Sequence, residues 1–288
     1  MKGFDYILTK QIAWANRNKI QLVGSEITKG RQAYTKILDQ NLFEPLLSET
    51  KIEIEKGDGG ELKGDAFHSP KMCAVHSSSV IGVNVLQYWK NKTIPDIAYV
   101  LGLCRKDNKS AQEIHFEQKF KISNKFRFDP NIDAVIYNGK NDKIKAFGIE
   151  CKFSEAYSSR NHPGLKEKYL TDISDQWKDI PKLFDFAKTI SPNDKSFHHL
   201  HPAQLIKHIL GLKKKYGKNG FRLLYLWYDV LGEEGCRHSK EIAEFTKITK
   251  QDKIKFHSIS YQELIINLKR KIYKGNEVYI DYLTKRYL

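Results

Sequence analysis

The sequence of 288 residues has few cysteines, no long apolar segment and no low-complexity tract. Its four cysteines, Cys73, Cys104, Cys151 and Cys236, lie far apart, with no CxxC pair and no Cys/His spacing typical of a zinc site. We therefore expect reduced thiols in a cytoplasmic protein. There is no internal repeat and no long linker, so we expect a single domain over residues 1–288.

Apolar runs are too short or too polar for a membrane span. The longest uncharged run, Met72–Trp89, contains His76, three serines, Asn84 and Gln87. The segment Met1–Asn18 is polar and charged throughout, so no signal peptide is expected. A GxSxG motif is also missing. A Ser–His nucleophile pair at His76-Ser77-Ser78-Ser79 therefore stays a distant alternative, and helix capping is the expected role of these serines.

Acidic residues are scarce relative to basic ones. Asp plus Glu number 34 against 49 Lys plus Arg, which gives a net charge of +15. A protein this basic suits a polyanionic partner, because neutralised phosphates drive non-specific nucleic-acid binding. The alternative is a genome-wide bias toward Lys, Ile and Asn. Charge alone leaves both explanations open.

The chain instead concentrates its signals in 128–155, FDPNIDAVIYNGKNDKIKAFGIECKFSE. Two short apolar runs, Ile132–Tyr137 and Ala146–Phe153, flank a polar Asn-Gly loop, which predicts a β-hairpin. Glu150 and Lys152 then project to the same face of their strand, roughly 7 Å apart. An antiparallel hairpin would return Asp133 to the neighbouring strand, close to both.

Buried charges of this kind need partners. Burying an unpaired ion costs on the order of several kcal/mol, so a buried charge is normally paired with an opposite charge or bound to a metal. Two adjacent carboxylates repel, and Mg²⁺ is commonly held by one or two carboxylates with water and substrate phosphate. A lysine beside them would orient or activate water, or stabilise charge on phosphate. The alternative is a solvated Glu150–Lys152 ion pair at a strand edge.

The spacing Asp133–x16–Glu150–Cys151–Lys152 resembles the D…ExK signature of the PD-(D/E)XK nuclease superfamily, which includes many restriction endonucleases. The "PD" dipeptide is relaxed here to Pro130-Asn-Ile-Asp133. The resemblance implies a Mg²⁺ site, with Mn²⁺ as a substitute, held by Asp133 and Glu150 and by the carbonyl of Cys151. It implies that Lys152 orients or activates water.

The flanking segments resemble a bacterial subgroup of uncharacterised PD-(D/E)XK proteins. Its HSS-x(4)-VN segment corresponds to His76-Ser-Ser and Val83-Asn84, and its Q-L-x-K-H segment to 204–208. By this resemblance Glu117, in the first core strand, and Gln204, in the helix after the ExK strand, are second-rank site candidates. A solvent-facing carboxylate and a solvated helix face are the respective alternatives.

Two further groups of polar residues stay open. Arg160, His162 and Lys166 lie just past the hairpin and would meet phosphates, unless they form only a surface loop. The cluster His198, His199 and His201 is interpreted as a loop rather than a metal site, because no carboxylate or cysteine lies near it in sequence.

The periodicities predict a mixed α/β protein. The core order is helix, three strands, helices and a fourth strand, which the resemblance assigns to a restriction-endonuclease-like mixed central sheet flanked by helices. The catalytic core is expected at about 75–230. Strands are expected at 114–121, 132–138, 146–153, 222–229 and 253–260, with a short strand plus loop in 52–64. Helices are expected at 4–17, 29–47, 74–89, 94–103, 171–189, 202–216, 236–247, 260–271 and 276–286.

The resulting prediction is a Mg²⁺-dependent endonuclease that hydrolyses DNA, in a restriction or defence role. The runner-up is a nucleic-acid-binding protein on the same fold that does not cut. The expected partner is DNA, with no membrane attachment and with a homodimer left open.

Overall fold

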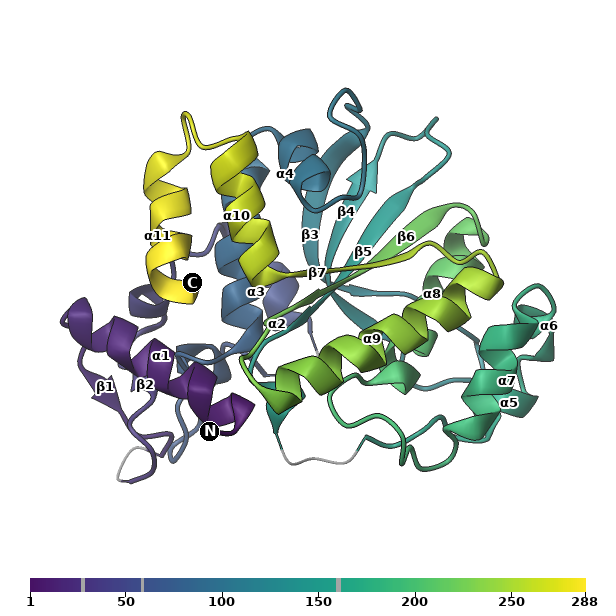
Figure 1. Cartoon of the computed structure of the whole chain (residues 1–288), viewed down its shortest axis with the longest axis horizontal. Helices are drawn as coiled ribbons and strands as arrows, with labels where there is room; N and C mark the ends of the chain where they lie inside the picture. Colours follow the sequence, from purple (N-terminus) through teal and green to yellow (C-terminus); the bar gives the residue numbers. More distant parts are fainter. Residues whose placement is uncertain (27–28, 58–59, 159–161) are drawn as a thin grey trace.

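The computed structural model describes residues 1–26, 29–57, 60–158 and 162–288. Its centre is a five-stranded sheet of order β3-β4-β5-β6-β7 (Figure 1). The strands β3, β4 and β5 are antiparallel in turn, whereas β5, β6 and β7 are parallel. This confirms the predicted mixed α/β class. The strand bounds are Ala111–Lys119 (β3), Asn131–Asn138 (β4), Ala146–Lys152 (β5), Phe221–Trp227 (β6) and Phe256–Ser260 (β7).

The predicted hairpin is formed by β4 and β5. Their register pairs Tyr137 with Ala146 and ends at Ala134 with Ile149. The chain then leaves β5, forms helices on one side of the sheet, and returns as β6 alongside β5. β6 is almost fully buried, as expected for an apolar central strand. The carboxyl ends of β5 and β6 and the start of β4 therefore share one end of the sheet.

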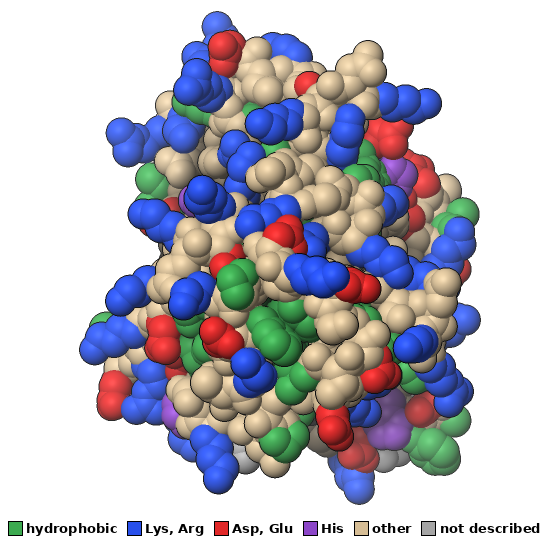
Figure 2. Space-filling model, turned by 90° about the vertical axis from the view of Figure 1, so that its right-hand side faces the viewer, with side chains coloured by type: hydrophobic (Ala, Val, Ile, Leu, Met, Phe, Trp, Pro, Cys, Tyr) green, Lys and Arg blue, Asp and Glu red, His purple; other side chains and the backbone are tan. Residues whose placement is uncertain are grey.

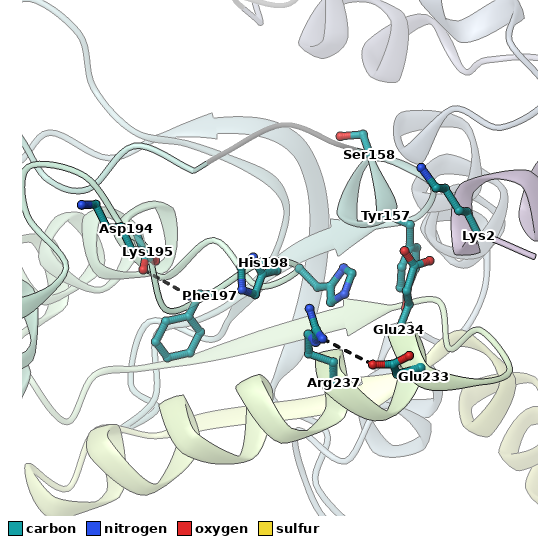
Figure 3. Close-up of a pocket in the computed structure, with 11 residues that line it drawn as sticks. Lys2, Tyr157, Ser158, Asp194, Lys195, Phe197, His198, Glu233, Glu234 and Arg237 are labelled. Carbon is teal, nitrogen blue, oxygen red and sulfur yellow. Dashed lines mark hydrogen bonds and ion pairs between the residues drawn. The ribbon is translucent and has the colours of Figure 1, made fainter.

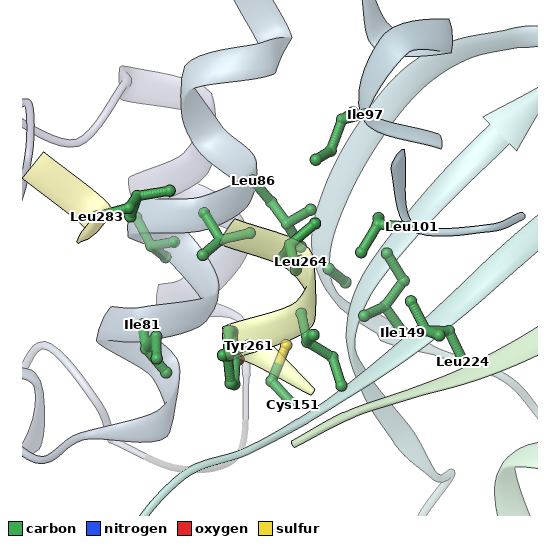
Figure 4. Packing of buried hydrophobic residues seen from close by; sticks show 14 of the residues in the cluster. Ile81, Leu86, Ile97, Leu101, Ile149, Cys151, Leu224, Tyr261, Leu264 and Leu283 are labelled. Carbon is green, nitrogen blue, oxygen red and sulfur yellow. The ribbon is translucent and has the colours of Figure 1, made fainter. Parts of the chain in front are cut away.

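One face of the sheet packs against helices from both ends of the chain. Isoleucines and leucines of these helices meet Ile149 and Leu224 in a continuous apolar core (Figure 4). The buried side chain of Arg286 stacks on Trp14 and bonds Gln11 and Asn41, which ties the C-terminal helix to the N-terminal segment. These helices are α1 (Gly3–Arg17), α2 (Ser48–Glu55), α3 (Ser78–Leu86), α4 (Ile94–Val100), α10 (Tyr261–Lys271) and α11 (Glu277–Tyr287).

The opposite face carries a second core, which packs against the helices that precede and follow β6. Among them, α8 (Pro202–Tyr216) lies directly over β5 and β6, and α9 (Glu233–Gln251) joins β6 to β7. Three shorter helices complete this layer: α5 (Lys168–Thr171), α6 (Ser174–Trp177) and α7 (Pro181–Thr189). The single helix predicted for 171–189 was therefore wrong. Pro181 begins α7, at a position where its missing N–H costs nothing.

Two predictions in the N-terminal third were also wrong. The helical pattern of 29–47 is instead the short strand β2 (Tyr34–Thr35), paired with β1 (Leu22–Val23), and a 3₁₀ turn. Hydrogen bonds from this segment to residues 73–75 override its helical pattern. The strand expected near Ile52 and Ile54 belongs to helix α2, which buries Thr50 and Ile54 and exposes Ile52. The alternation of Ile with Glu in this segment is also typical of a strand, which is why the prediction was wrong.

No helix in the four described ranges is both long and apolar enough to cross a membrane.

Candidate active site

The C-terminal end of β5 brings a carboxylate and an ammonium group into contact beneath α8. Glu150 and Lys152 alternate with Cys151 and so project from the same face of the strand. Lys152 Nζ lies 2.7 Å from Glu150 Oε1. Glu150 is fully buried and the Lys152 side chain is only 14% exposed. The pair is therefore an internal ion pair and differs from the solvated strand-edge pair that the tripeptide alone would allow.

A third group, His208 of α8, completes this cluster. Its Nε2 lies 2.9 Å from the second carboxylate oxygen, Glu150 Oε2. Sequence analysis grouped His208 with Gln204 but gave it no role in the site. The available signal was helical spacing, since residues four apart share a helix face. Gln204 is half-buried on that face, one turn before His208.

The charges of this cluster are held firmly in place. Burial alone would raise the pKa of Glu150, but the charges of Lys152 and His208 outweigh burial and lower it to about 2. Burial would likewise lower the pKa of Lys152, and the surrounding carboxylates, Glu150 first, hold it above its ordinary value. Lys152 is therefore a protonated cation at neutral pH, able to stabilise negative charge but unable to accept a proton.

Asp133 lies where β4 and β5 separate. The register places it opposite Glu150, one step beyond the last pair. Its Oδ2 accepts a hydrogen bond of 2.7 Å from the backbone N–H of Cys151. Burial raises the pKa of Asp133, and the Glu150 charge raises it further, although Lys152 opposes this. Asp133 is thus a carboxyl group that lacks sufficient positive charge.

Glu117 lies on the other side of Asp133, at an irregular point of β3. Its φ is 52°, in the left-handed region that non-glycine residues seldom adopt, although the register with β4 is the same on both sides of it. Asn131 donates to its carboxylate. Glu117 and Asp133 both line a narrow pocket that also borders Ser78 and Ser79 at the start of α3. Its charge adds to those that raise the pKa of Asp133.

Cys151 projects its thiol from the opposite face of β5 to Glu150 and Lys152, and it lines the pocket of Glu117 and Asp133. The sulfur lies in the apolar core with Tyr261 and Ile81, beneath α3 and α10 (Figure 4). Burial raises the pKa of this thiol. Its N–H points toward β4, and the N–H and C=O of one strand residue point to the same side. Any contribution of Cys151 to a metal would therefore come from its carbonyl.

The donor set fits a hard, oxygen-binding cation of the Mg²⁺ type. No three or more His, Cys, Asp and Glu side chains cluster as a preformed metal cage among the described residues. Mg²⁺ does not need one, because water and phosphate fill most of its positions. Lys152 Nζ and His208 Nε2 each lie within ion-pair distance of one Glu150 oxygen. An ionised carboxylate offers about four lone-pair sites, so these two contacts leave room for a further ligand. Burial first and the Glu150 charge second raise the pKa of Asp133, and a divalent cation beside it would oppose both effects.

The remaining sequence candidates have mainly structural contacts. Ser77 caps α3 by accepting from the N–H of Val80, and burial lowers the pKa of His76, packed against the rings of Phe4 and Tyr34, to about 4. Glu241 accepts from the backbone N–H groups of 198–200, which fixes the loop of the histidine cluster.

His201 stacks on His162 at 4.6 Å between ring centres. Burial lowers the pKa of both rings, and the Lys152 charge contributes to each shift. These two rings therefore lie near the Lys152 end of β5. Lys166 is exposed, and Arg160 lies outside the described residues.

A larger cavity opens beside the same end of the sheet. It has a volume of about 570 Å³ and is lined by residues of both charges (Figure 3). Tyr157 and Ser158 reach it after β5, whereas Glu233 and Arg237 reach it from the start of α9. The lining residues include none of the five predicted catalytic side chains. We therefore locate the candidate active site at Glu150, Lys152 and Asp133 and not in this cavity.

Comparison with known proteins gives one family. A family model described as "Restriction Endonuclease associating with ARP" matches residues 10–288. Comparisons with curated proteins and with solved structures gave no match. The matched segment includes the whole sheet and every side chain of the candidate site. The chain therefore belongs to the family of restriction endonucleases associating with ARP.

Proposed function

We propose that this protein is a metal-dependent endonuclease of the PD-(D/E)XK type that hydrolyses phosphodiester bonds of DNA. The observation that carries the proposal is the buried cluster of Glu150, Lys152 and His208 with Asp133 opposite. Apolar residues would fill this position at lower cost. Titratable groups with perturbed pKa values are typical of functional sites.

Each side chain has a distinct role in this proposal. Lys152, fixed by Glu150, presents a cation to the scissile phosphate, where preorganised charge stabilises the transition state. His208 is a positioning residue, because it acts through Glu150. Asp133 and Glu150 with the Cys151 carbonyl would hold Mg²⁺ or Mn²⁺, which polarises phosphate and lowers the pKa of bound water. Glu117 and Gln204 are further candidates beside Asp133 and His208.

DNA is the proposed substrate on two grounds. The family description names restriction endonucleases, and the net charge of +15 suits a polyanion. Lys and Arg side chains are spread over the face seen in Figure 2, with acidic side chains between them. From the same description we take association with ARP as part of the proposal. A cytoplasmic location is also part of the proposal.

Incubation of purified protein with supercoiled plasmid tests the proposal. Nicked or linear product should appear with Mg²⁺ or Mn²⁺ and vanish in excess EDTA. An Asp133→Asn variant purified in parallel controls for a contaminating nuclease. Cleavage that continues in EDTA would contradict metal dependence. Salt-sensitive DNA binding without cleavage under any metal would support the runner-up, a binding protein on the same fold.

A further inference from the structure

The loop between β3 and β4 lies at the end of the sheet that carries Asp133. The loop covers residues 120–130, between the end of β3 and the start of β4. The N–H of Phe120 bonds the carbonyl of Pro130, which closes the base of the loop. Its exposed tip, at Phe128, is five positions before Asp133 in the sequence. Since an extended chain spans at most about 3.6 Å per residue, the two Cα atoms are no more than roughly 18 Å apart.

The loop is anchored to the body of the protein. The carbonyl of Ile122 accepts bonds from Gln176 of α6 (2.6 Å) and Lys214 of α8 (2.9 Å). Phe126 is buried against Tyr169, with 4.7 Å between ring centres. Because the loop is held at its base and middle, its tip has a defined position relative to the site.

Two residues of the tip point outward together. Phe128 is 64% exposed, and the guanidinium of Arg127 lies 5.0 Å from its ring centre. Covering exposed apolar area is worth about 25 cal/mol per Å², so a ring that an anchored loop holds in solvent beside a cation is available to a flat apolar surface. Lys121 and Lys125 are exposed on the same loop, and Asp129 is its only acidic residue. The surroundings thus suit a polyanion that also presents flat apolar surfaces.

We propose that the side chain of Phe128 stacks on a base of the DNA substrate, with Arg127 contacting the adjacent phosphate. Aromatic rings flanked by cations are a common stacking surface for the bases of single strands, and in duplexes apolar side chains insert between base steps and partly unstack them. Phosphates of one strand follow at about 3.4 Å, so the contacted base would lie within about five nucleotides of the scissile phosphate. The inference rests on the proposed function and names a contact of that site with its substrate.

Equilibrium binding to a fluorescein-labelled duplex, measured by anisotropy without divalent metal at several salt concentrations, tests the inference. Phe128→Ala should weaken binding roughly tenfold to a hundredfold and leave the salt slope unchanged, because it removes stacking but no charge. Arg127→Gln should reduce the slope by about one. Phe128→Trp should retain wild-type affinity, and its indole fluorescence should be quenched by DNA.

Val278→Ala is the matched control. Val278 is an apolar residue of α11 that is 78% exposed, and its replacement should leave DNA binding unchanged. If Phe128→Ala binds as tightly as this control while the wild type binds and cleaves, the stacking inference is overturned and the ring belongs to a contact with another protein. If the wild type binds no DNA even at low salt, the proposed function fails as well.

Discussion

The two carboxylates of the candidate site lie in opposite electrostatic surroundings. Glu150 has Lys152 at one carboxylate oxygen and His208 at the other, and its pKa is lowered to about 2. Asp133 accepts one backbone N–H, and burial and neighbouring acids raise its pKa. From this difference we expect a division of labour, in which Glu150 is ionised and fixed before metal binds and Asp133 responds to the cation. Four predictions test this division.

The largest expected effect is on stability at Glu150. Glu150→Gln leaves the buried Lys152 ammonium without its main partner, and removal of one member of a buried ion pair costs about 3–5 kcal/mol. Urea unfolding in EDTA at neutral pH measures the loss. Glu233→Gln is the control: its side chain is 87% exposed in a surface pair with Arg237, and we expect a change within about 0.5 kcal/mol. Equal losses in the two variants would contradict the buried pair.

The next effect is on cleavage at Lys152. Lys152→Ala should lower the single-turnover rate at least about a hundredfold, which corresponds to about 2.7 kcal/mol of transition-state stabilisation. Lys152→Arg should also be impaired, because the planar guanidinium places its charge differently. Metal binding should survive in both variants. Rates within a fewfold of wild type for both would remove Lys152 from the mechanism.

The fold and the hairpin that carries the candidate residues were predictable because their signals are local. Alternation and the Asn-Gly turn gave β4 and β5, and the capping box at Ser260 gave the start of α10. The charges on β5 stood out because they interrupt an apolar strand. The segment of helix α2 was predicted as a strand because the burial of Thr50 and Ile54 depends on β3, which lies far along the chain.

The electrostatic asymmetry could not be predicted in the same way. His208 contacts Glu150 only because α8 packs across β5. The two residues are 58 positions apart in the sequence, and no local pattern predicts their 2.9 Å contact. Glu117 has a positive φ that alternation along a strand conceals. Sequence spacing therefore identified the charged groups, whereas packing decides which of them are neutralised.

The third prediction concerns metal. If Asp133 is the group that lacks a cation, Mg²⁺ at ten times its Kd should stabilise the folded protein by about 1.4 kcal/mol. Asp133→Asn should lose most of this gain. Thermal unfolding with and without Mg²⁺ measures it, and Ca²⁺ serves as a second oxygen-binding cation. An equal Mg²⁺ gain in wild type and Asp133→Asn would place the metal elsewhere.

The smallest effect distinguishes the two carboxylates by pH in the absence of metal. A raised pKa in the folded state means that stability is fully present at low pH and falls as pH rises through that pKa, which is the expectation for Asp133. Glu150 has the opposite sign: its lowered pKa contributes stability above about pH 4.5 that is lost as pH falls toward 2.

Asp133→Asn in EDTA should therefore be more stable than wild type at pH 8, with the difference shrinking toward pH 4. The gain is modest, because an asparagine oxygen still accepts from Cys151. Urea midpoints for both proteins across this range decide the sign. A variant less stable than wild type at pH 8 would mean that Asp133 is already neutralised, and the contrast with Glu150 would disappear.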